Sequence, residues 1–197
     1  MTASLQAAVL KTPDRINREN APGLKVGESA PDFSALNTAG SRVVLSDLYQ
    51  SGPVVLIFYR GAWCPYCNLH LRQFQSKLPE FRNLGATLIA VSVDKPVYAQ
   101  KISDEQNLGF DVISNPDAGI LTDYKSSFLV PKELAEKYKN EYGLDLELYS
   151  GRKDYLIAVP ATYVIDSGGI VRFAYADTDY TTRVSPDQVL DFLRSKK

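Results

Sequence analysis

Hydrophobic positions along the 197-residue chain fall into short unbroken apolar runs separated by stretches with helical spacing. The clearest run is Pro53 to Phe58, where β-branched and aromatic residues follow one another without a polar interruption. Such a run is typical of a strand buried on both faces of a mostly parallel sheet. Thr87 to Val93 and Val159 to Ile165 have the same character. We therefore predict a central sheet with strands in these three places.

Helical spacing dominates the segments that follow the first two runs. We predict a helix from Pro65 to about Leu84, kinked at Pro79 because proline removes one main-chain hydrogen bond and crowds the preceding turn. Gly85 is the expected stop of this helix. A second helix is predicted from Pro96 to about Asn107, and the strand–helix–strand unit should have a right-handed crossover.

Turn and capping signals are strong near the C-terminus. Residues 166–169 read Asp-Ser-Gly-Gly, a tight turn that leads into a hairpin partner at residues 170–176. Ser185, Pro186 and Gln188 form a capping-box pattern, which predicts that the last helix begins there.

Weaker signals predict the remaining elements. These are a helix at residues 2–10, a strand pair at 33–35 and 42–45, a helical turn capped by Ser46, a strand at 110–113, and a helix in 115–124. Residues 126–155 look like an insertion with a helix beginning at Pro131, whose Leu134, Tyr138 and Tyr142 repeat every four residues. That stripe favours packing over a substrate mouth. The predicted organisation is an N-terminal extension, 1–23, and a single domain, 24–197, with an insertion at about 126–155.

Composition and charge exclude several classes of function. The net charge of -1 gives no electrostatic basis for binding nucleic acid or an anionic membrane. No apolar stretch reaches the roughly 18 residues of a membrane span. The first twenty residues lack the apolar core of a signal peptide, so we expect a cytoplasmic protein, whose cysteines are more often catalytic than structural.

The candidate chemistry lies in Cys64 and Cys67, the only two cysteines, which have the spacing of a redox-active C-x-x-C. Pro65 is favoured at the first position of a helix, so Cys64 should lie at or next to the N-cap. Free N–H groups and the helix dipole stabilise a thiolate there and lower the thiol pKa. Cys67 shares a helical face with Leu71 and Phe74 and should be the more buried sulfur. The pattern predicts an exposed attacking thiolate with a shielded partner.

Other uses of the two cysteines are less favoured. A disulfide between residues three apart closes a very small loop and stabilises little. Zinc would need two further ligands, and the chain offers only His70 and scattered carboxylates. Haem attachment requires a histidine directly after the second cysteine, where Asn68 stands. His70 itself lies off the face shared by Cys67 and Leu71, so we do not expect it to act as a base or ligand.

The order of elements and two motifs resemble the peroxiredoxin-like branch of the thioredoxin superfamily, the alkyl hydroperoxide reductase/thiol-specific antioxidant family. The motifs are Phe-Tyr-Arg-Gly-Ala-Trp-Cys-Pro-Tyr-Cys at residues 58–67 and Val-Pro-Ala-Thr-Tyr-Val-Ile-Asp at residues 159–166. The resemblance implies an α/β, thioredoxin-like fold with a central mixed sheet flanked by helices. It also implies that Trp63 shields the cysteine site and that Pro160 faces the cysteine pair through a cis Val159–Pro160 peptide. The alternatives are a packed aromatic and an ordinary trans proline.

The chain departs from the family pattern at groups that orient the peroxide and stabilise negative charge. Gly61 stands where a threonine is typical, Ile57 where a proline is, and Pro160 where an arginine is. Arg60 could supply the missing cation near Cys64, with a solvent-facing Arg60 as the alternative. Arg183 is a more distant candidate.

Three functions remain open on the sequence. The first is a thiol peroxidase in which Cys64 attacks a hydroperoxide, Cys67 resolves the sulfenic acid, and a thioredoxin- or glutaredoxin-type donor restores the dithiol, without cofactor or metal. The second is a thioredoxin-like reductase of protein disulfides. The third is a non-enzymatic domain whose cysteines bind metal or pack. A homodimer is compatible with each of them.

Overall fold

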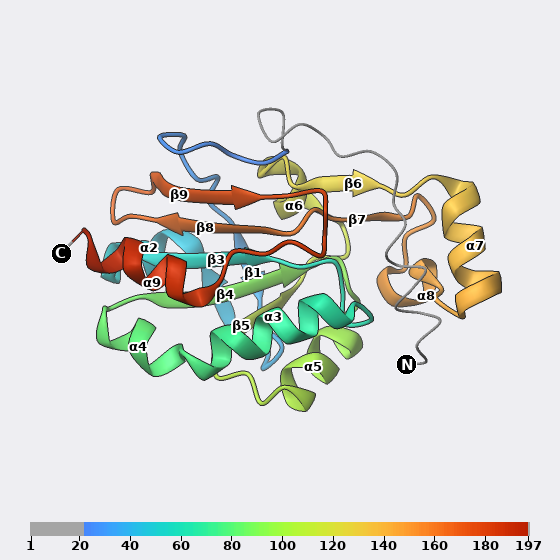
Figure 1. Ribbon diagram of the computed structural model, residues 1–197, viewed down its shortest axis with the longest axis horizontal. Coiled ribbons are helices and arrows are strands. Elements are labelled where there is room, and N and C mark those ends of the chain that lie inside the picture. Colours follow the sequence, from blue (N-terminus) through green and yellow to red (C-terminus); the bar gives the residue numbers. More distant parts are fainter. Residues whose placement is uncertain (1–21, 197) are drawn as a thin grey trace.

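The computed structural model describes residues 22–196, so the predicted helix at 2–10 and nearly all of the extension 1–23 lie outside the described residues. The described chain is an α/β structure built around a five-stranded mixed sheet of order β5-β4-β3-β8-β9 (Figure 1). The parallel strands are β3 (Val54–Phe58), β4 (Thr87–Ser92) and β5 (Asp111–Ser114). β8 (Ala161–Ile165) runs antiparallel to β3, and β9 (Val171–Ala176) antiparallel to β8. The thioredoxin-like arrangement expected from the sequence is confirmed.

β3 is buried along its whole length, and its side chains alternate between two cores. Val55 and Ile57 enter one core, whereas Val54, Leu56 and Phe58 enter the other. Successive side chains of a strand point to opposite faces of its sheet, so an unbroken apolar run is what a strand covered on both sides requires.

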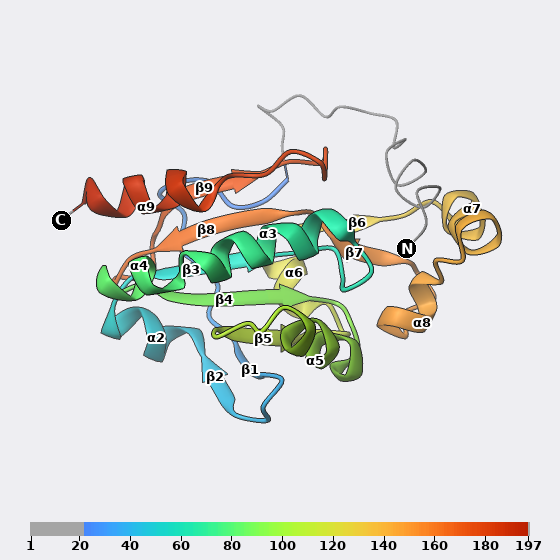
Figure 2. The same ribbon diagram turned by 60° about the horizontal axis from the view of Figure 1, so that its bottom comes forward.

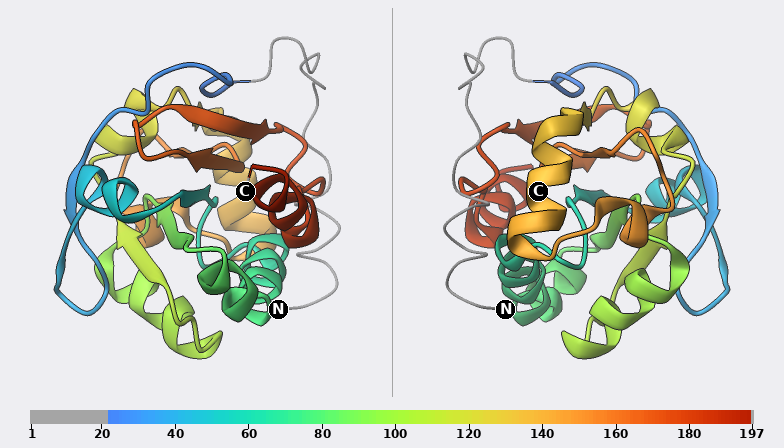
Figure 3. Two further views of the ribbon diagram at one scale, coloured as in Figure 1. Left: turned by 90° about the vertical axis from the view of Figure 1, so that its left-hand side faces the viewer. Right: turned by 90° about the vertical axis from the view of Figure 1, so that its right-hand side faces the viewer.

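Helices cover both faces of the sheet (Figures 2 and 3). The core with Val55 is closed by α3 (Pro65–Ser76), α4 (Leu78–Asn83), α5 (Pro96–Glu105) and α9 (Pro186–Arg194). The opposite core is closed by α2 (Leu45–Ser51), α6 (Gly119–Asp123) and the segment that carries the antiparallel pair β1 (Ser34–Leu36) and β2 (Arg42–Val44).

Two local predictions need correction. The helix expected from Pro65 to Leu84 is broken at Lys77, and Pro79 is the second residue of a new helix, where its missing N–H is not needed. Ser46 does not cap α2, because the N-cap is Val44 and no side chain caps it. The capping box at Ser185 is confirmed in full, with both of its reciprocal hydrogen bonds to Gln188 present.

The segment predicted as an insertion contains more structure than its sequence indicated. β6 (Ser127–Leu129) pairs with β7 (Leu156–Ala158), and α7 (Lys132–Tyr142) and α8 (Leu146–Ser150) lie between them. Pro131 is the N-cap of α7, so the helix start was correctly predicted. Tyr138 is buried in the core, which agrees with packing as the role of the stripe. α7 and α8 lie at the end of the sheet where β3 leads into α3 (Figure 1).

Over the described range, 22–196, the helices are too short or too polar to cross a membrane.

Candidate active site

The cysteines lie at the carboxyl end of β3, where the chain turns into α3. The N–H of Tyr59 still donates to the carbonyl of Val91, at 3.1 Å, and the chain then leaves the sheet. Cys64 is the N-cap of α3, with φ -90° and ψ 112°, and Pro65 is the first helical residue. The predicted position of Cys64 at the N-cap is therefore confirmed, and Cys67 follows in the first turn.

Asp94 holds the loop that carries Cys64. Its Oδ2 accepts the N–H of Ala62 at 2.7 Å, and its Oδ1 is buried without a hydrogen-bond partner. A Cβ on Gly61 would lie 2.8 Å from this Oδ1 and 2.3 Å from Nε1 of Trp63. Glycine is required here because the carboxylate and the indole approach the backbone so closely. Burial raises the pKa of Asp94 to about 7, although the Ala62 N–H favours the ionised form.

Both sulfurs are enclosed, which corrects the expectation of an exposed Cys64 with Cys67 shielded behind it. Cys64 is 0% exposed and Cys67 is 1% exposed, and both are free thiols. Cys64 is the N-cap residue of α3 and is nevertheless buried, so a position at a helix terminus does not by itself expose a sulfur.

Arg183 lies against Cys67 rather than Cys64, with its Nη2 3.6 Å from the Cys67 sulfur. Burial opposes ionisation of Cys67, but a hydrogen bond from the Cys64 thiol and the charges of Arg183 and Arg60 outweigh it and lower the pKa of Cys67. Burial, together with the hydrogen bond and negative charge of Cys67, raises the pKa of Cys64. These contacts favour a thiolate on Cys67 that accepts the S–H of Cys64.

Arg60 supplies a second cation and is held between two aromatic rings. Its guanidinium carbon lies 4.0 Å from the ring centroid of Tyr180 and 4.9 Å from that of Trp63. The side chain is 3% exposed, and its Nη1 has no hydrogen-bond partner. The alternative of a solvent-facing Arg60 is thus wrong. Trp63 is buried as well, at 4% exposed.

One loop, residues 177–184 between β9 and α9, brings three groups to the site. Tyr180 stacks on Arg60, Arg183 contacts Cys67, and the carbonyl of Val184 lies 2.9 Å from Nε2 of His70. His70 is 4% exposed and is buried on α3 together with Cys67 and Leu71, contrary to the expectation that it lies off the face these two residues share.

Pro160 lies at the same end of the sheet as the cysteine loop, because the next residue, Ala161, pairs with Phe58. Its carbonyl accepts the N–H of Asp177, at 3.2 Å, where the loop 177–184 begins. None of the peptide bonds within residues 22–196 is cis, so the expected cis Val159–Pro160 peptide is wrong.

Sequence reasoning missed Asp94 and Tyr180. Asp94 could have been predicted, because it follows a buried strand parallel to β3. The carboxyl ends of parallel strands meet at one edge of the sheet, so Asp94 should lie near the loop that follows β3. Tyr180 lies in a loop whose sequence has no periodic pattern, so nothing in the sequence indicated that it lies at the site.

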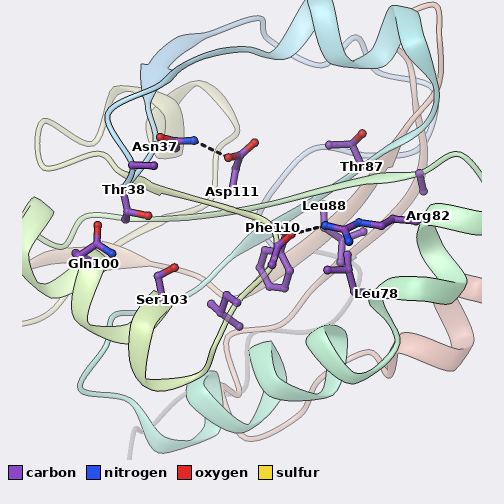
Figure 4. A pocket seen from close by; sticks show the side chains of 14 residues that line it. Asn37, Thr38, Leu78, Arg82, Thr87, Leu88, Gln100, Ser103, Phe110 and Asp111 are labelled. Carbon is purple, nitrogen blue, oxygen red and sulfur yellow. Dashed lines mark hydrogen bonds between the residues drawn. The ribbon is translucent and has the colours of Figure 1, made fainter.

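Surface clefts lie both next to the cysteine loop and at the opposite end of the sheet. A cleft of about 410 Å³ borders the cysteine loop at Ala62 and Trp63 and reaches α5 and Leu144. A second, of about 420 Å³, lies at the amino ends of β4 and β5, the opposite end of the sheet (Figure 4). There Asn37 donates to Asp111 and Arg82 to the carbonyl of Gly109, each at 2.7 Å, so these polar groups are already paired.

Within the part of the chain that the structure describes, no three His, Cys, Asp or Glu side chains gather as a metal site would require.

Comparison with known proteins gives the same family for most of the chain. Residues 26–174 match the AhpC/TSA family. A putative peroxiredoxin bcp of Helicobacter pylori strain J99 is 30% identical over 148 residues, which cover 75% of this chain and 85% of that protein. A putative peroxiredoxin of Mycobacterium tuberculosis is 33% identical over 99 residues, which cover 50% of this chain but only 62% of that protein.

Solved structures share the fold at lower identity. The crystal structure of peroxidoxin BcpB from Mycobacterium tuberculosis has a TM-score of 0.69 at 21% identity and covers 88% of this chain and 99% of its own. A mutant PrxQ from Xylella fastidiosa has a TM-score of 0.69 at 17% identity, with coverage of 88% and 97%. The family match over residues 26–174 includes the cysteine loop and strands β3, β4, β5 and β8, and the chain belongs to the AhpC/TSA family.

Proposed function

We propose that the protein is a thiol-dependent peroxidase that reduces hydroperoxides, with Cys67 as the attacking thiolate and Cys64 as the resolving thiol. The observation that carries this proposal is the Arg183 guanidinium 3.6 Å from the Cys67 sulfur. A cation at that distance favours the thiolate, which is the nucleophilic form of cysteine. This reverses the roles expected from the sequence, because a charged partner next to Cys67 outweighs the N-terminal position of Cys64.

The first chemical step oxidises Cys67. The thiolate attacks one oxygen of ROOH, an S–O bond forms as the O–O bond breaks, and the leaving alkoxide takes a proton to give ROH. The unpartnered Nη1 of Arg60 is free to donate to oxygen atoms of the peroxide, and donors that meet developing charge lower the barrier. The product is a sulfenic acid on Cys67.

The second step forms a disulfide and releases water. The sulfur of Cys64 attacks the sulfur of Cys67–SOH, the S–O bond breaks, and the hydroxide leaves with the proton of the Cys64 thiol. Cys64 is close enough to hydrogen bond to Cys67 before the reaction. A thioredoxin- or glutaredoxin-type dithiol then reduces the disulfide by thiol–disulfide exchange. Such donors operate in the cytoplasm, which we include in the proposal as the location of the protein.

Access to the sulfurs requires movement. Both are enclosed, and the Arg60 guanidinium, whose charge acts on both thiols, contacts the rings of Tyr180 and Trp63. We propose that the loop 177–184 and these rings shift to admit the peroxide and, later, the reductant.

The test compares substrates on the reduced wild-type protein. Stopped-flow measurements with hydrogen peroxide, an organic hydroperoxide and a protein disulfide report which of them oxidises the dithiol fastest. The proposal predicts rapid oxidation by at least one peroxide and slow exchange with the protein disulfide. Fast exchange with the disulfide and slow reaction with both peroxides would instead support a thioredoxin-like reductase.

A further inference from the structure

We propose that His70 is a positioning residue whose hydrogen bond to the carbonyl of Val184 holds the Arg183 guanidinium at the sulfur of Cys67. The inference rests on the proposed function only for the catalytic role of Cys67. The arrangement it describes is a two-point attachment between α3 and the loop 177–184.

The spacing of the two contacts along the helix matches their spacing along the loop. Cys67 and His70 are one turn apart on the buried side of α3, and residues three apart in a helix lie on the same face. Arg183 and Val184 are consecutive in the loop, and each contacts one of these two helix residues. A shift of the loop along the helix would therefore break both contacts together.

The ring of His70 is fixed in the orientation that this hydrogen bond needs. Phe74, one turn further along α3, meets it edge to face, with centroids 4.9 Å apart and an interplanar angle of 84°. A carbonyl oxygen only accepts, so Nε2 of His70 carries the proton that it donates to Val184. Burial lowers the pKa of His70 to about 4, so the ring is a neutral donor throughout the neutral pH range.

Arg183 depends on the loop backbone for its direction. Its Nη1 donates to the carbonyl of Thr182, its own neighbour, at 3.1 Å. None of the carboxylates within residues 22–196 forms an ion pair with it. The position of the loop backbone therefore orients the guanidinium. His70 holds that backbone next to Arg183 through its hydrogen bond to the carbonyl of Val184.

Several titratable or charged groups act on Cys67, from four parts of the chain. They come from the end of β3, the end of β4, the N-cap of α3 and the loop 177–184: Tyr59, Arg60, Cys64, Asp94 and Arg183. His70 contacts the loop that bears Arg183 and is itself uncharged, so replacing it changes the position of a charge without removing one.

The test is a double-mutant cycle read by the ultraviolet absorbance of the thiolate as a function of pH. His70→Leu removes the donor, His70→Gln keeps an N–H at similar reach, and Arg183→Met removes the cation. We expect His70→Leu to move the ionisation midpoint upward and to slow peroxide oxidation at neutral pH by roughly three- to tenfold, the range for one lost hydrogen bond. His70→Gln should restore most of the ionisation midpoint and most of the oxidation rate. The double variant His70→Leu/Arg183→Met should behave like Arg183→Met alone, because the cation that His70 positions is then absent.

An unchanged midpoint in His70→Leu, or effects of the two substitutions that simply add, would overturn the proposal. Phe81→Leu is the matched control, because Phe81 stacks on Phe74 rather than on His70, and it should leave the midpoint in place. If His70→Leu does not fold, His70→Asn, whose amide is shorter than the imidazole, takes its place in the cycle. The titration needs no peroxide, so a protein that passes it but ignores peroxides would contradict the proposed function and leave this inference intact.

Discussion

At the scale of single residues, ionisation of Cys67 is decided by a competition between burial and charge. The sulfur is 1% exposed, and removal from water disfavours a thiolate. A hydrogen bond from the Cys64 thiol and the charges of Arg183 and Arg60 reverse that preference, and the attraction of these charges is stronger away from water. Burial would keep an isolated cysteine protonated and inert. Here it also strengthens the attraction between the Cys67 thiolate and the nearby cations, which favours the reactive form.

Asp94 provides a test of how the loop at Gly61 and Ala62 is held. Its pKa is raised by burial from 3.8 to about 7, so between these values the folded state keeps a proton that the unfolded state has lost. Stability must then fall as pH rises through this window, by at most about 4 kcal/mol. Asp94→Asn cannot ionise, so its stability relative to wild type should increase from about pH 4 to pH 7 and level off above it.

Denaturant unfolding of both proteins across this pH range measures the difference directly. Titrating groups that do not interact with Asp94 are common to both proteins and cancel. A difference that does not change with pH would show that Asp94 ionises in the folded protein as it does in the unfolded chain.

Gly61→Ala tests how closely the cysteine loop is packed. The added Cβ would lie 2.3 Å from Nε1 of Trp63 and 2.8 Å from Oδ1 of Asp94, so the indole or the loop must move, at about 1–3 kcal/mol for overpacking. Gly40→Ala is the control: Gly40 also has positive φ, but nothing lies within 4 Å of its Cβ position. Chemical denaturation should show a larger loss for Gly61→Ala, and equal losses would mean that backbone strain alone is responsible.

At the scale of elements, α9 fixes the far end of the loop that carries Arg183. The N-cap Ser185 accepts the N–H of Gln188 at 3.2 Å and directly follows Val184. Ser185→Ala should lower the free energy of unfolding by about 1 kcal/mol, as expected for a lost N-cap. Ser76→Ala, which removes an exposed serine at the end of α3, should lower it less. Similar losses in thermal unfolding would contradict a structural role for the capping box.

The elements that could be predicted are those with local signals. β3 has an unbroken apolar run, α3 begins at a proline after its N-cap, and α9 begins with a capping box, so all three were correctly placed. β6, β7 and α8, which lie in and directly after the segment 126–155, were missed because they are short and depend on packing. The break at Lys77 was expected only as a kink, since proline at a second helical position starts a new helix as readily as it bends an old one.

At the scale of the whole molecule, the site is assembled by the sheet from segments far apart in sequence. The loop after β3 brings Cys64 and Arg60, the end of β4 brings Asp94, and the loop after β9 brings Arg183 and Tyr180. The β3–β4 and β3–β8 registers place these segments at one end of the molecule.

This assembly explains what the sequence could not decide. Arg183 was recognised as a distant candidate, yet it is 116 residues from Cys67, and no local pattern shows which of the two sulfurs it approaches. The helix N-terminus favoured Cys64 because it is a local feature of the sequence, whereas the contact between Arg183 and Cys67 depends on the fold.

The most direct test of the account is single-turnover oxidation of Cys64→Ser and Cys67→Ser by hydroperoxide, followed by stopped flow and intact mass. The account predicts that Cys64→Ser is oxidised rapidly once, to a sulfenic acid on Cys67, and does not turn over, whereas Cys67→Ser loses rapid oxidation. Rapid oxidation of Cys67→Ser, with its loss in Cys64→Ser, would assign the attack to the other sulfur and contradict the role given to Arg183.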